Sequence, residues 1–117
     1  MALLALKRVY DPPAAEDGVR ILVDRLWPRG IPRASVDLWL KDIAPSNELR
    51  RTFHGQPERW DAFRAAYAAE LGTAPAVAAL AILKDRLEAG PVTLLYAARD
   101  EEHNNAVALK LWLDGNA

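Results

Sequence analysis

The sequence contains no cysteine. This absence excludes disulfides, thiol nucleophiles, iron–sulfur clusters and cysteine-ligated zinc. Hydrophobic runs are short, and none approaches the roughly 18 residues that span a membrane. The apolar segment 1–6 has neither the basic start nor the length of a signal peptide. We therefore expect a soluble, cytoplasmic protein that does not act at a membrane.

Familiar cofactor and catalytic motifs are also missing. The chain has no G-x-G-x-x-G, no Walker-type lysine loop and no G-x-S-x-G. Its two histidines do not form an H-x-x-x-H or H-E-x-x-H pair, so we predict no metal site, and the cofactor stays unknown. A net charge of −1 argues against a protein that coats nucleic acid without sequence preference.

What is present describes an ordinary globular chain. Its 117 residues are 51% hydrophobic and 26% charged, which predicts one domain over residues 1–117. Eleven of its 15 basic residues are arginine, whose planar guanidinium binds carboxylates and phosphates through two hydrogen bonds. A GC-rich genome would give the same excess.

The order of elements predicts the fold class. Apolar runs predict strands at 3–10, 19–24 and 92–97, and the segment 37–43 fits a short strand, which we favour, or a single helical turn. Helices are expected from a Ser46 N-cap to Gly55, then at 57–71, 75–89 and 100–114. The third should bury Val77, Leu80, Leu83 and Leu87, and the fourth Val107 and Leu111. A long helical crossover before the last strand predicts an α/β fold: a three-layer sandwich with a mostly parallel, Rossmann-like sheet flanked by helices.

In such sheets ligands bind beyond the carboxyl ends of the strands, and one polar segment follows the second strand. Residues 24–30 hold a carboxylate, two arginines and an indole. Arg25 and Arg29 could bind the oxygens of an anion while Trp27 stacks on a planar group. The alternative is structural: Trp27 fills the core, and Asp24 forms an ion pair with Arg25.

A second polar segment, 97–105, follows the last strand. Asp100 would cap the next helix, which places His103 in its first turn as a base or ligand. Arg99 would lie where helix N-termini bind anions. The alternative is that this acidic and amide-rich stretch is only good helix-starting chemistry.

Two weaker candidates lie between these segments. His54 follows Phe53 at the end of a predicted helix, where it could simply meet the negative end of the helix. Ser46 is one of two serines, and N-capping accounts for it.

Four segments together resemble the YeaO-like family, a domain of unknown function. They are 23–30, 39–46, 53–54 and 94–106, and the resemblance extends from about Lys7 to Leu113. It implies an α/β fold and no established activity. Related members outside this subfamily carry a cysteine motif that this chain lacks, so the resemblance implies no thiol chemistry.

Our leading hypothesis is a binding protein or enzyme for a small anionic ligand, a phosphate- or carboxylate-bearing metabolite; whether it is an enzyme stays open. The candidate acid–base residues are Asp24, His54, Glu101 and His103. The candidate ligand-binding residues are Arg25, Trp27, Arg29, Ser46, Arg99 and Asn104. The alternative is a nucleic-acid-binding or protein-interaction module that uses the arginines and Trp27 of residues 20–33. The oligomeric state is not predicted.

Overall fold

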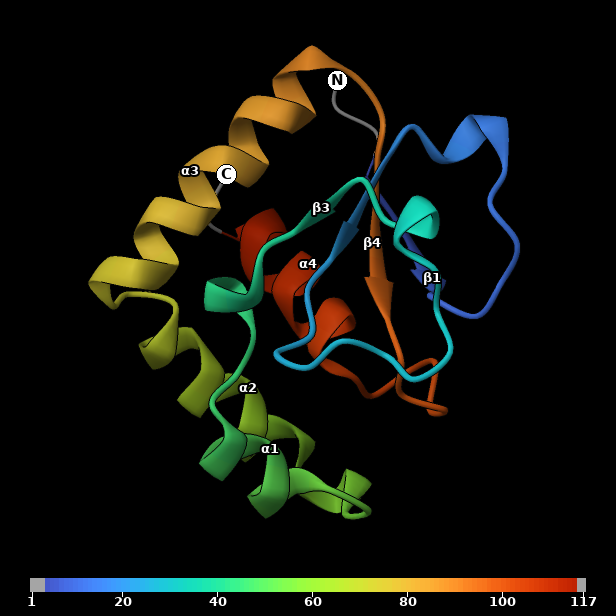
Figure 1. Ribbon diagram of the computed structural model, residues 1–117. Coiled ribbons are helices and arrows are strands. Elements are labelled where there is room, and N and C mark those ends of the chain that lie inside the picture. Colours follow the sequence, from blue (N-terminus) through green and yellow to red (C-terminus); the bar gives the residue numbers. More distant parts are fainter. Residues whose placement is uncertain (1–3, 116–117) are drawn as a thin grey trace.

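A four-stranded parallel sheet forms the centre of the molecule (Figure 1). The computed structural model describes residues 4–115. The strands are β1 (Leu4–Arg8), β2 (Val19–Leu22), β3 (Leu38–Trp39) and β4 (Val92–Tyr96), in the order β1-β4-β2-β3. Every neighbouring pair is parallel. All five residues of β4 are buried between β1 and β2, as expected for a continuous apolar run in a parallel sheet.

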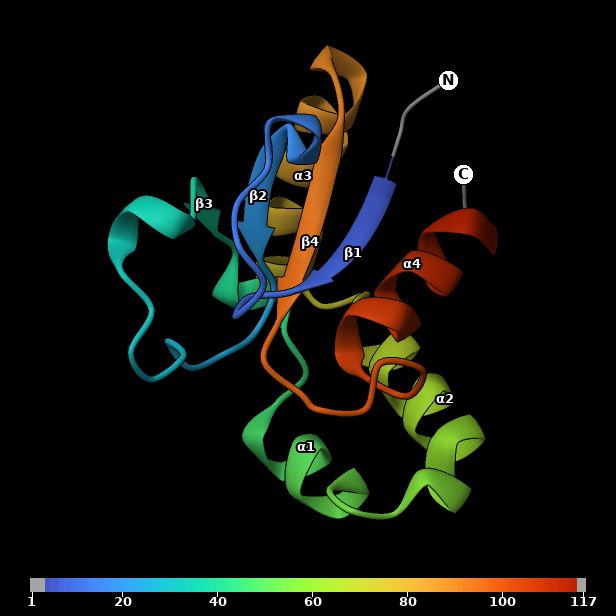
Figure 2. The same cartoon turned by 90° about the vertical axis from the view of Figure 1, so that its right-hand side faces the viewer.

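Four α-helices accompany the sheet: α1 (Asn47–Phe53), α2 (Trp60–Glu70), α3 (Ala74–Ala89) and α4 (Asn105–Gly115). The first three form the crossover from β3 to β4, and α4 follows β4 (Figures 1 and 2). Their apolar side chains share one core with one face of the sheet, where Phe63, Leu83 and Leu109 belong to the same cluster as Ile21 and Leu94. The helices thus bury one face of the sheet.

The opposite face is covered by irregular segments. Leu22 and Leu95 lie there with Val9, and Trp27 and Trp39 pack against them. The third layer of this sandwich therefore consists of the loop between β2 and β3, with its 3-10 turn at Arg33–Ser35, rather than of α-helices. The predicted α/β class, with a parallel sheet flanked by helices, is confirmed.

Several predicted elements lie where the sequence placed them. The segment 37–43 contains both of its alternatives, a two-residue β3 and a 3-10 turn at Lys41–Ile43. Ser46 caps α1, because its Oγ accepts a hydrogen bond from the N–H of Leu49 at 3.1 Å. Leu3, the first residue of the first predicted strand, lies outside the described residues.

The start of the last helix was predicted wrongly. Asp100 Oδ1 accepts the N–H groups of Glu102 and His103 and so forms a turn instead of the first turn of a helix. Asn104 is the actual cap, since its Oδ1 accepts the N–H of Val107 at 2.9 Å. His103 therefore precedes α4 rather than lying in its first turn.

Two predicted core residues are on the surface: Val77 is 52% exposed and Leu111 is 41% exposed. On α3 the adjacent Ala76 is buried in place of Val77. On α4 the buried position is Leu109, and two residues correspond to about 200° around a helix, so Leu111 faces outward. Leu80 and Leu83 are buried as predicted.

No single helix in the described part of the chain is long and apolar enough to cross a membrane. The pair Pro57–Glu70 and Ala74–Ala89 meets that test only jointly, with a 93° bend between its members.

Candidate functional site

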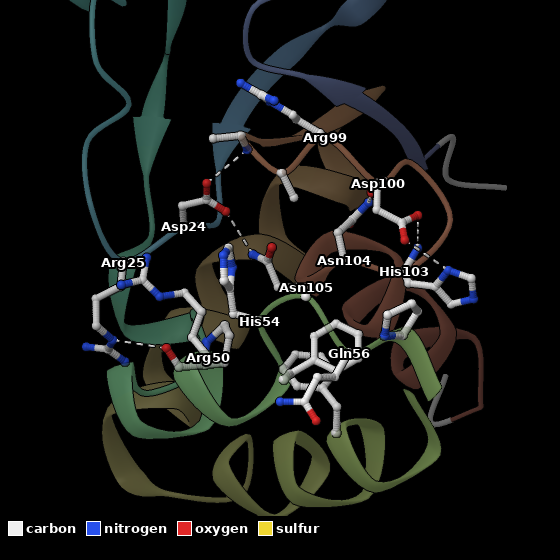
Figure 3. A pocket seen from close by; sticks show the side chains of 17 residues that line it. Asp24, Arg25, Arg50, His54, Gln56, Arg99, Asp100, His103, Asn104 and Asn105 are labelled. Carbon is white, nitrogen blue, oxygen red and sulfur yellow. Dashed lines mark hydrogen bonds and ion pairs between the residues drawn. The ribbon is translucent and has the colours of Figure 1, made fainter. Parts of the chain in front are cut away.

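A pocket of about 660 Å³ opens at the carboxyl edge of the sheet (Figure 3). Since the strands are parallel, the segments that follow them leave the sheet at the same edge. Residues after β2 and β4 line the pocket together with α1 and the start of α4. Pockets of this volume commonly hold small molecules. The two polar segments that the sequence singled out thus contribute to one cavity.

Asp24, directly after β2, is held by three other segments. Its Oδ2 accepts the N–H of Ala97 at 2.9 Å, and its Oδ1 accepts Nδ2 of Asn105 at 2.9 Å (Figure 3). Its backbone carbonyl accepts Nε1 of Trp39 at 2.7 Å. Burial raises the pKa of Asp24, and this effect outweighs the two hydrogen bonds and the positive charge of Arg50, which act in the opposite direction. Asp24 is therefore a fixed carboxylate with only neutral hydrogen-bond donors.

The ion pair between Asp24 and Arg25, considered from the sequence, is absent from the described residues. Arg25 donates instead to two backbone carbonyls in front of α1, from Nε to Pro45 at 3.2 Å and from NH2 to Ala44 at 3.0 Å. These bonds hold the guanidinium beside the pocket that it lines. They also use part of its donor capacity.

Arg50 lines the same pocket, and sequence reasoning did not select it. It lies on α1 four residues before His54, and residues at this spacing share one face of a helix. That spacing was the available signal. In the view of Figure 3 the His54 ring points toward Asp24 and Asn105. Within residues 4–115 the guanidinium of Arg50 makes one hydrogen bond, to Oδ1 of Asn47 at 3.3 Å, so it retains donors for a ligand.

The segment after β4 supplies a second polar wall with Arg99, Asp100 and His103. The Nδ1 atom of His103 lies 3.2 Å from Oδ2 of Asp100, and the ring meets Trp60 edge-on with centroids 5.3 Å apart. Hydrogen bonds from the backbone N–H groups of Glu102 and His103 hold the pKa of Asp100 below its ordinary value. Because Nδ1 contacts Asp100, Nε2 of His103 points away from Asp100, at the edge of the pocket (Figure 3).

Two asparagines begin α4 and have different partners. Asn104 is buried, donates from Nδ2 to the carbonyl of Asp100 and accepts from Val107, so its amide is committed to the backbone. Asn105 donates from Nδ2 both to Asp24 and to the carbonyl of Val23, each at 2.9 Å. Both residues line the pocket, and Asn105 was not among the predicted site residues.

Part of the lining is apolar. The rings of Phe53 and Phe63 stack with centroids 4.6 Å apart and an interplanar angle of 27°. Pro45 and Pro57 also line the pocket. A ligand with a flat or apolar body would therefore find both apolar surface and charged groups.

Four predicted site residues do not line this pocket: Trp27, Arg29, Ser46 and Glu101. Trp27 packs in the loop layer, where its Nε1 donates to Ile31 and its ring meets Trp39 edge-on at 5.4 Å. Ser46 donates from Oγ to Glu70 at 2.7 Å in addition to capping α1. Arg29 and Glu101 are exposed. The other six predicted residues, Asp24, Arg25, His54, Arg99, His103 and Asn104, share the pocket.

Metal-binding clusters are absent from residues 4–115: no group of three or more histidine, aspartate or glutamate side chains there could hold an ion.

Together the fold and the pocket define a small α/β domain with a mixed polar and aromatic pocket at the carboxyl edge of a parallel sheet. The chain belongs to the family described as the Inactive DUF488-N3 subclade, whose model matches residues 3–117. It is 47% identical over 109 residues to the uncharacterized protein YeaO of Escherichia coli, an alignment that covers 92% of this chain and 93% of that protein. It is 44% identical over 110 residues to uncharacterized proteins of Mycobacterium tuberculosis and Mycobacterium bovis, covering 92% of this chain and 91% of each. No solved structure matches. The resemblance to the YeaO-like family is confirmed, and these relatives carry no named activity.

Proposed function

We propose that this protein binds a small organic anion, a phosphate- or carboxylate-bearing metabolite, in the pocket at the carboxyl edge of the sheet. One observation carries this proposal: Arg25, Arg50 and Arg99 come from three different segments and line a single pocket. Guanidinium groups bind carboxylates and phosphates through paired, charge-assisted hydrogen bonds.

The two aspartates of the pocket form no ion pair with these arginines in the described part of the chain, so the guanidinium groups can bind an anionic ligand. Asp24 is hydrogen-bonded to Ala97 and Asn105, and Asp100 to the backbone after it and to the His103 ring. Among the described residues no ion pair joins either carboxylate to Arg25, Arg50 or Arg99. A bound anion would supply the counter-charge that the protein itself does not.

Binding without turnover fits the chain better than catalysis. The family to which the chain belongs is described as inactive. The His103 ring lies at the edge of the pocket rather than over its centre (Figure 3). We therefore assign the pocket to recognition of a ligand.

Calorimetric titration with inorganic phosphate, adenosine monophosphate and 3-phenylpropionate tests the proposal. We expect at least one organic anion to bind, and Arg50→Gln to weaken it about 10- to 100-fold, the effect of losing a charged hydrogen bond. Arg51→Gln is the matched control, because Arg51 lies next to Arg50 on α1, is exposed and does not line the pocket. Equal losses in the two variants, or no binding of any probe, would overturn the proposal.

A further inference from the structure

We infer that the ligand of this pocket carries a nitrogen donor, an ammonium or amino group, beside its anionic group, and that Asp24 and Asn105 receive this donor. This inference rests on the proposed function, because it adds a second recognition element to the same pocket. It narrows the ligand from any organic anion to a molecule with both kinds of group.

The first step is a count of hydrogen-bond acceptors. An ionised carboxylate offers about four acceptor sites. The structure fills two of them on Asp24, one on each oxygen, with the N–H of Ala97 and with Nδ2 of Asn105. Asp24 lines the pocket, so its remaining sites are within reach of a ligand.

The second step concerns the amide of Asn105. Its Nδ2 donates to Val23 and to Asp24, which uses both of its hydrogens. Turning the amide by 180° would place Oδ1 against these two acceptor oxygens, so the positions of Nδ2 and Oδ1 are determined. No group within residues 4–115 donates a hydrogen bond to Oδ1 of Asn105, so this oxygen is a further acceptor beside Asp24.

The third step is charge. A carboxylate removed from water is costly unless it meets a positive charge with good geometry. Arg50 acts on Asp24 through its charge, but the hydrogen bonds of the carboxylate come from neutral donors. A ligand ammonium or amino group would supply directed donors at this point.

The fourth step places both groups on one ligand. Arg50 and Arg25 approach the pocket from α1 and the segment after β2, while Asp24 and Asn105 present acceptors to the same cavity. The stacked Phe53 and Phe63 provide apolar surface for the body of the ligand. An aromatic amino acid and an amino-substituted nucleotide share this chemistry, a donor nitrogen and an anion on a flat apolar body.

The test compares pairs of probes that differ in the donor group. Phenylalanine is compared with 3-phenylpropionate, which lacks the ammonium group, and adenosine monophosphate with inosine monophosphate, which has a carbonyl in place of the amino group. In calorimetric titrations we expect the amino member of at least one pair to bind about tenfold or more tightly than its partner. The pair that shows this preference identifies the source of the donor.

Variants then locate the preference. Asp24→Asn should reduce the preference for the amino member over its partner at least tenfold. Asp37→Asn is the control, because Asp37 also accepts a backbone N–H, from Arg20 at 2.9 Å, but does not line the pocket. Asn105→Ala is a second variant that keeps the carboxylate, and it should reduce the preference by a smaller factor.

The outcomes separate the two proposals. If both members of each pair bind equally to the unmodified protein, or if the preference survives Asp24→Asn, the inference is wrong and the anion-binding function stands. If no member of either pair binds, both are wrong.

Discussion

Asp17 and Asp24 lie at opposite ends of one strand and have opposite surroundings. Asp17 precedes β2 and is 7% exposed; its Oδ2 lies 2.6 Å from NH1 of Arg20 and 3.1 Å from Nζ of Lys7. Asp24 follows β2, and its carboxylate accepts hydrogen bonds only from neutral groups among the residues that the structure describes. At the amino edge of the sheet Asp17 forms ion pairs with two basic side chains, whereas at the carboxyl edge Asp24 forms none within residues 4–115.

The pKa values of these two carboxyl groups shift in opposite directions. Burial alone would raise the pKa of Asp17, but the N–H of Ala14 and the side chains of Arg20 and Lys7 more than reverse this and hold it below its ordinary value. Burial raises the pKa of Asp24, and its neutral partners do not reverse it. The comparison teaches that charged side chains compensate Asp17 within the fold, while the carboxylate of Asp24, which lines the pocket, is held by neutral donors.

The largest expected difference comes from removing each charge in turn. Asp17→Asn should lower the free energy of unfolding by about 3 kcal/mol, because it leaves the buried Arg20 without its counter-charge. The NH2 atom of Arg20 already has no hydrogen-bond partner among the described residues, so this guanidinium depends on Asp17. Asp24→Asn should cost less, about 1–2 kcal/mol, because it removes one hydrogen bond accepted from a neutral donor and leaves no buried cation without its counter-charge.

Urea unfolding followed by the fluorescence of the four tryptophans measures both values. Circular dichroism at zero denaturant confirms that each variant is folded before unfolding begins. Similar losses for the two variants would contradict the distinction between an aspartate with charged partners and one with neutral partners.

The sequence predicted the class of the fold and the edge at which the pocket lies, because both follow from local patterns. The apolar run 92–97 and the long helical crossover indicated a parallel sheet, and such sheets place their loops at one edge. This reasoning brought Asp24 and His103 together although they are far apart in the chain.

Side-chain partners could not be predicted in the same way. Trp27 is a residue type that often binds planar ligands, but in this fold it packs against Trp39 in the loop layer. That tertiary contact could not be predicted from the local sequence. Asn104 and Asn105 are identical in type, and only the start of α4 determines that the first caps the helix and the second reaches Asp24. Asp100 was an equally good candidate cap, so the sequence did not distinguish the two helix starts.

A smaller difference is expected between two glycines, one at each edge. Gly18 has φ +64°, and a Cβ there would lie 2.2 Å from the carbonyl oxygen of Pro91, which accepts the N–H of Val19. Gly55 lines the pocket with φ +71°, and a Cβ there would meet nothing within 4 Å. Gly18→Ala should therefore cost about 2–3 kcal/mol, from the left-handed backbone and overpacking together, and Gly55→Ala about 1 kcal/mol.

Thermal and urea unfolding of the two glycine variants measure this difference. Gly30→Ala serves as a control. Gly30 also has a positive φ of 79° and open space around it, but it lies neither beside Pro91 nor in the pocket. If Gly18→Ala cost no more than Gly30→Ala, the close approach of Gly18 to Pro91 would not constrain the amino edge.

The smallest expected effect concerns pH. The contributions of Asp17 and Asp24 to the free energy of unfolding should change in opposite directions as the pH falls. The pKa of Asp17 is lowered in the folded state, so its contribution to stability is present above the unfolded pKa and is lost as pH falls through the folded pKa. The pKa of Asp24 is raised, so its contribution is present below the unfolded pKa and is lost as pH rises through the folded pKa. Urea unfolding between pH 3 and 7 should then show the destabilisation by Asp17→Asn shrinking toward low pH, and the stability of the unmodified protein relative to Asp24→Asn increasing toward low pH. Parallel pH profiles for the two variants would show that both carboxylates are equally well compensated, and the distinction between the edges would then rest on geometry alone.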